Sequence, residues 1–364
     1  MKTYANLYSQ LCSYDNLELA FRKARRGKTA KPYVIAFEKN LESNLMQLRS
    51  ALLMHCYDPK PLVQFIIRDP KTRTISKSAF RDRVVHHALV NILEPIYEKR
   101  FIHDSYANRK GRGTLKALKR FDSFKRKASK NNTRACYVLK ADIRHYFEEV
   151  DQSLLLRIIT ERIKDESIIW LIRKILDNYA AKAKGKGMPL GNLTSQFFAN
   201  VYLNELDQFV KCSLKAKYYI RYVDDFILLA SGERVAEAYK DRIRLFLQKR
   251  LAITLHPTKS RIYRLGSRIT LLGFRVFYYH RLLKRQNMIK MRRTYASLKA
   301  RYIRGETGYD TIYNFLEGWL VYAKNADTYA MRRNFLAEFE SAFPDEISTK
   351  ELSRHCKACQ QQSF

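Results

Sequence analysis

The sequence lacks any apolar run long enough to cross a lipid bilayer, since stretches such as FILLA (226–230) have only the length of a core strand. Its first residues, MKTYANLYSQ, also lack the long apolar region of a secretory signal, so we expect a cytoplasmic protein without membrane partners. There is no internal repeat, low-complexity tract or long linker. With 364 residues, the chain can bury a sizeable core in two or three subdomains.

Regularly spaced cysteines are also missing. The six cysteines are scattered through the chain, which fits free thiols in a reducing compartment. Cys356 and Cys359, preceded by His355, have the spacing of half a zinc site, but a second pair at ligand spacing is absent. We therefore favour a basic C-terminal tail over a metal site in this segment.

Acidic residues are scarce. Asp and Glu number 35 against 69 Lys and Arg, which gives a formal net charge of +34, and the excess is spread along the chain. A strongly basic globular protein indicates a polyanionic partner, because bound phosphates release their counterions. No basic amphipathic anchor stands out, so nucleic acid is favoured over an anionic membrane surface.

Apolar periodicity predicts helices over most of the first sixty residues, and two strands follow around the turn-forming Asp69-Pro70. We expect helices across 81–134, a strand at 135–143, and a helix at 194–211. Two β-rich runs, KYYIRYV (217–223) and FILLA (226–230), precede a charged helix at 233–251. The segments 254–265 and 269–279 read as strands, and everything from about 281 reads as helical and basic.

Three aspartates lie where a metal site needs them. Asp142 closes the apolar strand at 135–143, and Asp224 and Asp225 fall between two β-runs, which predicts a hairpin tip. Nucleotide polymerisation uses two divalent cations about 3.5–4 Å apart, and hard cations such as Mg²⁺ take oxygen ligands. Alternatively, an Asp-Asp pair is ordinary surface chemistry, and an aspartate at a strand end often caps a helix. The surrounding motifs decide between these readings.

Six consecutive motifs resemble those of reverse transcriptases, in the expected order. They are FRDRVVHHAL (80–89), RFIHDSYANRKGRGTLKAL (100–118), VLKADIRHYFEEVD (138–151), RYVDDFILLA (221–230), LHPTKSRIY (255–263) and LLGF (271–274). The first two resemble bacterial, group II intron-type enzymes, and the last resembles the primer-grip strand. The resemblance implies an α+β right-hand polymerase with fingers, an antiparallel palm sheet and a helical thumb. We expect a helical extension at 1–58, fingers and palm at 59–280, and the thumb with a basic tail at 281–364.

One further motif points to a subfamily. Most reverse transcriptases carry a Gln-Gly motif where this chain has LGNLTSQ (190–196), and the form here resembles the enzymes of diversity-generating retroelements. Those enzymes copy RNA with frequent errors opposite adenine. Related bacterial enzymes serve in antiphage defence with a dedicated noncoding RNA, and this alternative stays open. A third alternative, a noncatalytic RNA-binding protein, is disfavoured because all three aspartates are present.

The resemblance assigns roles around the metals. It implies that Asp142, Asp224 and Asp225 hold two Mg²⁺ ions, with Mn²⁺ as an alternative, and that the carbonyl of Ile143 is a further ligand. Lys259 would protonate the departing pyrophosphate as a general acid, or else is a plain surface lysine.

The resemblance also assigns residues to the incoming dNTP. Phe147 would lie under the sugar and exclude a 2′-hydroxyl, or else belongs to the core. Arg73 would reach the triphosphate with its fork of donors, whereas Lys71 and Arg68 either contact it or face solvent. Leu190 replaces a glutamine that could hydrogen-bond near the nucleotide, which would loosen base selection, unless it merely packs.

Two basic segments are expected to contact nucleic acid. Residues 109–134 hold eleven Lys or Arg and one acid, and residues 281–304 hold nine and none. By resemblance, the partners are a structured noncoding RNA template, a DNA primer or cDNA product, dNTPs, and a small helical accessory protein.

Overall fold

The computed structural model describes residues 2–68, 72–179 and 183–362, with side chains described as far as residue 356. The chain divides into two compact units, formed by residues 1–124 with 136–262 and by residues 125–135 with 263–364. Among the residues described, no helix combines the length and apolarity needed to cross a membrane. The units are described separately below.

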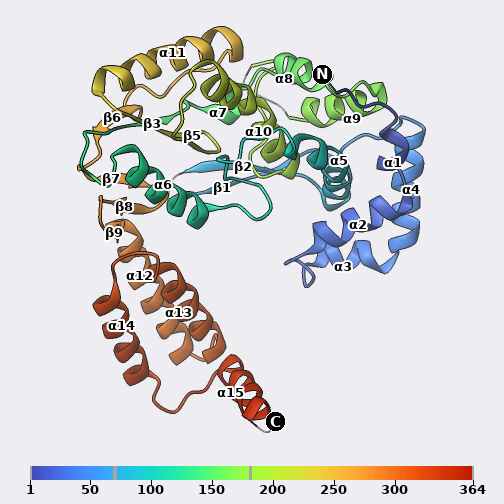
Figure 1. Cartoon of the computed structure of the whole chain (residues 1–364). Helices are drawn as coiled ribbons and strands as arrows, with labels where there is room; N and C mark the ends of the chain where they lie inside the picture. The colour runs from blue at the N-terminus through green and yellow to red at the C-terminus, as the bar shows by residue number, and fades with distance from the viewer. Residues whose placement is uncertain (1, 69–71, 180–182, 363–364) are drawn as a thin grey trace. The chain divides into compact units, whose positions relative to one another are not determined.

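The first unit is built mainly of helices around a small antiparallel sheet (Figure 1). Its helices are α1 (Tyr8–Leu11), α2 (Tyr14–Arg25), α3 (Pro32–Lys39), α4 (Leu41–Leu53), α5 (Phe80–Glu98), α7 (Tyr146–Glu149), α8 (Gln152–Thr160), α9 (Glu166–Asp177), α10 (Leu193–Gln208) and α11 (Glu233–Leu251). Helix α6 (Thr114–Ala128) begins in this unit. Several helices start at a side-chain cap, such as Asp151 for α8 and Asp165 for α9, each accepting a hydrogen bond from the backbone three residues on.

The central sheet has the strand order β4-β5-β3-β6, formed by β4 (Tyr219–Tyr222), β5 (Asp225–Ala230), β3 (Tyr137–Asp142) and β6 (Arg261–Arg264). Both β4 and β3 pair with β5 in antiparallel register, so the predicted antiparallel palm sheet is confirmed. From Phe226 to Ala230, β5 is buried without alternation, and α11 contacts both β3 and β5. A continuous apolar run is what a strand covered by helices requires.

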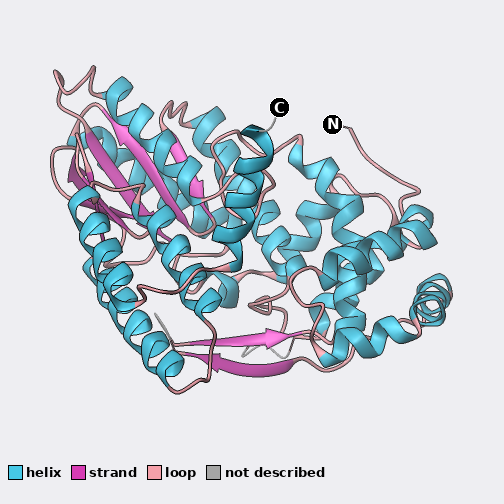
Figure 2. Cartoon of the chain, turned by 90° about the horizontal axis from the view of Figure 1, so that it is seen from below, coloured by secondary structure: helices cyan, strands magenta, loops and turns pink. Residues whose placement is uncertain are grey.

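A second sheet in this unit consists of β1 (Val63–Ile67) and β2 (Arg73–Lys77), paired from Val63↔Lys77 to Ile67↔Arg73. The two strands that the sequence predicts are therefore confirmed, while the turn predicted at Asp69-Pro70 lies outside the described residues. Figure 2 shows this hairpin lying apart from the β4-β5-β3 strands. The base of β2 is joined to the rest of the unit by a bond from the Ser76 amide to the Leu190 carbonyl at 2.9 Å.

The second unit contains a three-stranded antiparallel sheet and a helical bundle. Its strands are β7 (Ile269–Leu271), β8 (Phe274–Val276) and β9 (Arg281–Leu283), and its helices are α12 (Arg285–Ile303), α13 (Tyr309–Ala323), α14 (Tyr329–Ala342) and α15 (Thr349–Gln362). Phe335 anchors the bundle core, with ring centroids 5.0 Å from both Tyr295 and Trp319. The expected mixed fold with an antiparallel sheet and a C-terminal helical bundle is confirmed, whereas the three-part division at residues 58 and 280 stays a prediction.

Four details of the expected secondary structure were wrong. The strand expected at 254–265 is formed only over β6, at Arg261–Arg264. The segment 269–279 is two strands joined at Leu272 and Gly273, whose φ angles of 47° and 90° are those of a two-residue hairpin turn. LLGF is therefore a turn and not a single strand. Helix does not begin at 281, because Arg281–Leu283 form β9 against β8. The stretch 81–134 is two helices, since residues 99–113 are not helical.

Candidate active site

Two of the three predicted aspartates are paired on adjacent strands of the central sheet. Asp142 ends β3 and is directly opposite Asp225, the first residue of β5. Residues paired this way in antiparallel strands have Cβ atoms about 4.5–5.5 Å apart, and like charges so placed repel. Asp225 is thus part of the ladder and not at the hairpin tip, where the sequence pattern placed it. The strand pairing brings the two carboxylates together from positions 83 residues apart in the chain.

Asp224 lies beside this pair, in the two-residue turn between β4 and β5. Tyr222 and Asp225 close the turn, and the Ile143 amide donates to the Asp224 carbonyl at 3.3 Å. The first turn residue, Val223, has a φ of 54°. A β-branched residue in that region is strained, by about 1–3 kcal/mol, and such strain often marks a functional site.

The electrostatics of Asp224 show that the three carboxylates act on one another. Burial, with the nearby charges of Asp225 and Asp142, raises the pKa of Asp224 to about 6, although Arg73 and a backbone hydrogen bond oppose the rise. Burial and neighbouring negative charge both disfavour the ionised carboxylate. This environment favours either a proton or a bound cation.

The residues present fit a divalent metal ion by their chemistry. They supply only carboxylate and carbonyl oxygens, the ligands that hard cations take, and their mutual repulsion is what a cation would relieve. Within the described ranges, however, no three His, Cys, Asp or Glu side chains already stand close enough together to hold a metal ion. Ligation by this set therefore requires side-chain adjustment around the cation.

Asp142 accepts hydrogen bonds from the segment that follows α11. Its carbonyl accepts from the His256 amide at 2.8 Å and from the Ser260 hydroxyl at 3.3 Å. Its Oδ2 accepts from Lys259 Nζ at 3.2 Å. The side chain of Lys259 is 42% exposed and that of Asp142 is 18% exposed, so the pair sits at the rim of the site. The structure thus brings Lys259 into contact with Asp142, and its role as a general acid stays a prediction.

The residues predicted to bind the nucleotide differ in their exposure and in their distance from the aspartates along the chain. Arg73 begins β2, is exposed, and acts electrostatically on Asp224. Arg68 is exposed just after β1, and Lys71 lies outside the described residues. Phe147 in α7 is half-buried against the core, with its ring centroid 5.4 Å from that of Tyr146. Both its predicted role and its alternative as a core residue remain open.

Leu190 is half-buried, and its backbone is fixed independently of its side chain. Its carbonyl accepts from Ser76, and the next residue, Gly191, has a φ of 113°. A Cβ at position 191 would lie 2.6 Å from Ile75 Cγ2, so only glycine fits against β2 there. The segment is therefore packed tightly against the hairpin that carries Arg73.

The sequence did not predict the buried ion pair that supports the turn between β4 and β5. Arg221 in β4 and Asp207 in α10 form an ion pair at 2.6 Å in which both side chains are fully buried. Tyr219 Oη also donates to Asp207 Oδ1, at 2.9 Å. The available signal was an arginine inside the β-rich run KYYIRYV, because an unpaired arginine is rarely buried.

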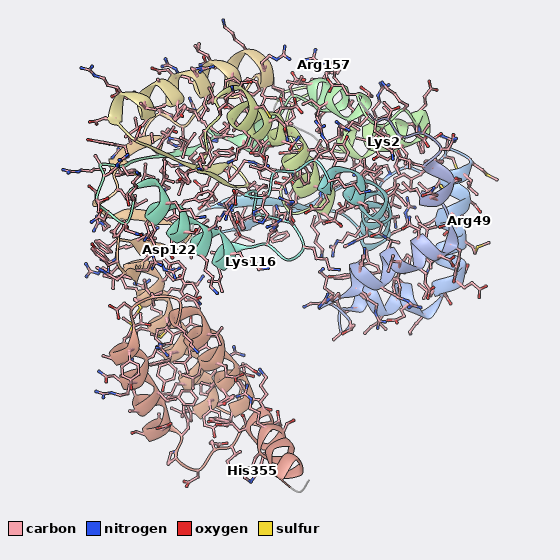
Figure 3. All side chains as sticks on the ribbon, in the orientation of Figure 1. Lys2, Arg49, Lys116, Asp122, Arg157 and His355 are labelled. Carbon is pink, nitrogen blue, oxygen red and sulfur yellow. The ribbon has the colours of Figure 1, made fainter. Side chains whose placement is uncertain are left out.

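The expected basic segment at 109–134 is only partly available to a ligand. Figure 3 marks Lys116 and Asp122 on α6, and Lys116 and Lys119 are exposed. By contrast, Arg109 binds Glu98 at 2.6 Å and Arg120 binds Asp104 at 2.7 Å. In the second unit, Lys125 is buried and donates to the carbonyls of Phe277 and Tyr278 at 2.8 and 2.9 Å. These three side chains are structural.

The C-terminal cysteine pair has no described metal partners. Cys356 is exposed and free, the side chain of Cys359 is outside those described, and the segment belongs to α15. Each of the five cysteines whose side chain is described is free, as expected.

Comparison with known proteins gives a consistent answer. Residues 67–276 match the family model described as reverse transcriptase (RNA-dependent DNA polymerase). Protein YkfC of Escherichia coli strain K12 is 27% identical over 289 residues, which are 69% of this chain and 74% of that protein. The group II intron-encoded protein LtrA of Lactococcus lactis subsp. cremoris is 24% identical over 347 residues, covering 75% of this chain and 57% of LtrA. Nuclear intron maturase 2, mitochondrial, of Arabidopsis thaliana is 26% identical over 193 residues, covering 48% and 25%.

Proposed function

The chain belongs to the reverse transcriptase family, in its group II intron-like branch as the motifs predict, and from this premise we propose that it copies an RNA template into DNA at Asp142, Asp224 and Asp225. The observation that carries the proposal is the register of β3 with β5, which pairs Asp142 with Asp225 next to the turn residue Asp224. The chain spans just over half the length of LtrA, so the activity of the whole protein is part of the proposal.

The three carboxylates would hold divalent cations, for which we propose two Mg²⁺ ions, with Mn²⁺ as a substitute. When bound, the ions activate the attacking 3′-hydroxyl and stabilise the leaving pyrophosphate. The carbonyl of Ile143 is a further proposed ligand. The protein's own contribution is to present oxygen donors from four backbone positions that the sheet and the turn hold fixed.

The remaining predicted residues orient the incoming dNTP and protonate the leaving pyrophosphate. Arg73 binds the triphosphate from β2, with support from Arg68 and Lys71. Phe147 lies under the sugar and excludes a 2′-hydroxyl. Lys259, already in contact with Asp142, passes a proton from its ammonium to the departing pyrophosphate.

At the finer level, we propose an error-prone enzyme of a diversity-generating retroelement. Support comes from Leu190, which stands half-buried beside β2 without a polar group to offer a base pair. The partners would be a structured noncoding RNA template, a DNA primer and a small helical accessory protein. The alternative is an antiphage defence enzyme that uses a dedicated noncoding RNA, and fidelity at template adenines separates the two roles.

The test of the activity is primer extension by the purified chain on an RNA template with dNTPs and Mg²⁺. Wild type extends the primer, whereas Asp142→Ala and Asp224→Asn lose extension while keeping a cooperative thermal transition. Asp151→Ala removes the cap of α8 without touching the site, so it controls for a modest loss of stability. Extension by Asp142→Ala at the wild-type rate would overturn the proposal.

A further inference from the structure

A side chain from the same hairpin holds the turn that carries Asp224. Arg221 Nη1 donates to the carbonyl of Val223 at 3.2 Å. Val223 is the residue with the positive φ of 54°, a conformation that a valine adopts only when its surroundings impose it. The bond from Arg221 therefore acts on the strained residue directly before Asp224 and Asp225.

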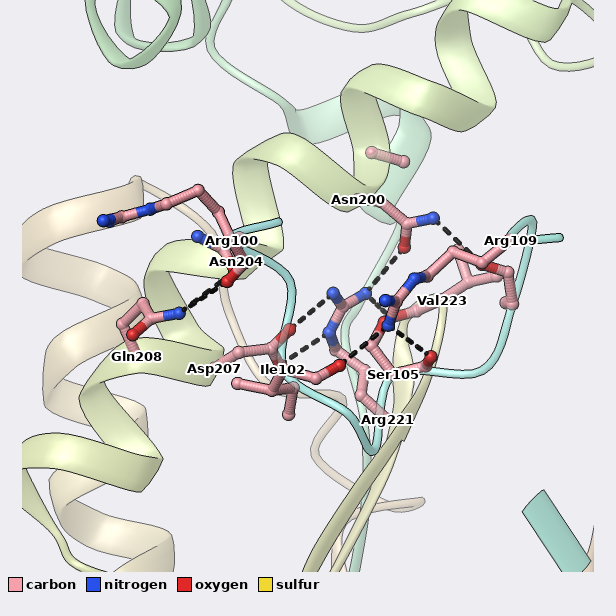
Figure 4. Close-up of polar contacts among 12 residues, drawn as sticks. Arg100, Ile102, Ser105, Arg109, Asn200, Asn204, Asp207, Gln208, Arg221 and Val223 are labelled. Carbon is pink, nitrogen blue, oxygen red and sulfur yellow. Dashed lines mark hydrogen bonds and ion pairs between the residues drawn. The ribbon is translucent and has the colours of Figure 1, made fainter. Parts of the chain in front are cut away.

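Arg221 is itself fixed on all of its nitrogens (Figure 4). Nε and Nη2 donate to the two carboxylate oxygens of Asp207 at 2.7 and 2.6 Å, and Nη1 also donates to Asn200 Oδ1 at 3.0 Å. A bidentate arginine–carboxylate pair fixes the plane of the guanidinium as well as its position. The direction of the bond to Val223 follows from that plane.

Asp207 and Asn200 both lie on α10, seven residues apart and hence on one face of the helix. Directly before α10, Asn192 Oδ1 accepts from the amide and the hydroxyl of Ser78, at 3.2 and 2.7 Å. One helix therefore supports the turn of Asp224 and is anchored at its start beside the Leu190 segment. Helix α10 therefore connects the turn that carries Asp224 with the start of the segment that follows Leu190.

A fully buried ion pair is a weak source of stability, because removing both charges from water offsets most of their attraction. Apolar side chains of similar volume would serve a core equally well. What apolar side chains cannot do is hold a backbone carbonyl in a chosen direction. The geometry here therefore favours a role in orientation over a role in stability.

We propose that Arg221, clamped by Asp207 and Asn200, is a positioning residue that holds the Val223 carbonyl and thereby aims the carboxylates of Asp224 and Asp225. The inference rests on the proposed function, because it assumes that these carboxylates bind the catalytic ions. The side chain of Arg221 is fully buried, so it would act through the turn and not by touching substrate or metal itself.

The test is single-nucleotide extension by the purified chain, titrated with Mg²⁺ and separately with dNTP. Arg221→Lys keeps the charge opposite Asp207, but an ammonium lacks the planar fork that reaches Asp207 and Val223 together. We expect the maximal rate to fall by about ten- to a hundredfold and the half-saturating Mg²⁺ concentration to rise severalfold. The KM for dNTP should change less than the rate does, since Arg73 binds from another element.

A matched pair of buried aspartates provides the control. Asp207→Asn alters a fully buried carboxylate bound by Tyr219 and Arg221, and Asp82→Asn alters one bound by Tyr57 at 3.0 Å and Arg81 at 3.3 Å. Both variants should lose thermal stability, but only Asp207→Asn should raise the Mg²⁺ requirement. If Asp82→Asn raises it equally, or Arg221→Lys leaves both rate and requirement unchanged, the positioning role is wrong.

Should Arg221→Lys fail to fold, Asn200→Ala removes the neutral bond to Nη1, together with the bond from Asn200 Nδ2 to the Ala107 carbonyl, and should shift the Mg²⁺ requirement in the same direction by a smaller factor. A wild-type requirement in a folded Asn200→Ala variant would then count against the proposal. An inactive wild-type chain, or an active Asp142→Ala variant, would instead overturn the proposed function. These outcomes are therefore distinct from those that overturn the positioning role of Arg221.

Discussion

Lys259 Nζ donates a hydrogen bond to Asp142 Oδ2 at 3.2 Å, so the proposed general acid is in direct contact with a proposed metal ligand. The contact joins the end of β3 to the loop that leads into β6, 117 residues further along the chain. A lysine in this position can act in two ways. It competes with a cation for the carboxylate oxygen, and it carries a proton that the leaving pyrophosphate needs.

Two substitutions separate these actions. Lys259→Gln removes charge and proton, so the maximal rate should fall by about a hundredfold while less Mg²⁺ is needed for half-saturation. Lys259→Arg keeps the charge beside Asp142, but its guanidinium does not release a proton. It should therefore lose rate like the glutamine variant while keeping the wild-type Mg²⁺ requirement. Single-nucleotide extension titrated with Mg²⁺ measures both quantities, and full activity in Lys259→Arg would exclude the general-acid role.

The raised pKa of Asp224 predicts how the metal-free protein responds to pH. Because the folded-state pKa is about 6 and the unfolded value is about 3.8, the folded protein binds more protons in between. Stability contributed by this group is therefore lost as pH rises from about 4 to about 6, and stays low above that. Asp224→Asn should then stabilise the chelator-treated protein at pH 8, by about 1–2 kcal/mol after allowance for partial exposure, and have little effect at pH 4.

Thermal unfolding with a chelator at the two pH values measures this difference. Adding Mg²⁺ at pH 8 should raise the melting temperature of wild type and raise it less in Asp224→Asn, because the ion binds only the folded state. An Asp224→Asn variant less stable than wild type at pH 8 would contradict the assigned environment of this carboxyl group.

Salt dependence of RNA binding should follow exposed charge and not total charge. Exchanging Lys116, Lys119, Arg285 and Arg293 for glutamine removes four exposed cations from the two basic segments. If each neutralises a phosphate of single-stranded RNA, the slope of log affinity against log salt should fall by about 3. The measurement is a filter-binding or anisotropy titration at several salt concentrations.

The matched control exchanges Arg234, Arg242, Lys249 and Arg250, which are exposed on α11 and belong to neither basic segment. This variant should keep the wild-type slope. Equal effects of the two sets would mean that the charge excess acts diffusely and that the segments have no special role.

Fidelity tests the proposed role of Leu190. The wild-type enzyme should misincorporate chiefly opposite template adenine, and Leu190→Gln should reduce those errors by about two- to twelvefold, the value of one hydrogen bond of 0.5–1.5 kcal/mol. The bond from Ser76 to the Leu190 carbonyl does not depend on the side chain, so the backbone should stay in place. Deep sequencing of cDNA made from a defined RNA gives the error spectrum.

Leu190→Met keeps the apolar character and should leave the spectrum as in wild type. If wild type copies adenine as accurately as the other bases, the retroelement role fails and the defence role is favoured. Because the expected effect is modest, we expect other residues, Arg73 first among them, to share in base selection.

Much of the site could be predicted from local sequence. Asp142 follows an apolar run, and Asp224-Asp225 separates two β-rich runs, so their strands and turn are determined by residues within a few positions. The same holds for the helix at 233–251, whose bounds match α11. Strand ends and tight turns depend on short-range pattern, which is why these elements agree with expectation.

Which charges are available to a partner was decided by the tertiary structure. Sequence counts Arg109, Arg120 and Lys125 with the other basic residues of 109–134, but folding commits them to Glu98, Asp104 and backbone carbonyls. Those partners come from other segments, and nothing within the basic stretch indicates them.

The sequence by itself determined the composition of the site: three carboxylates at a strand end and a β-turn, a lysine downstream, and a basic chain to hold a polyanion. Only the tertiary structure decided how the carboxylates are aimed, because that depends on Arg221 meeting Asp207 from another element in a fully buried pair. The physical reason is desolvation: a buried charge is tolerated only where the whole fold supplies its partner. The strained φ of Val223 has the same origin, since local preference alone would not place a valine there.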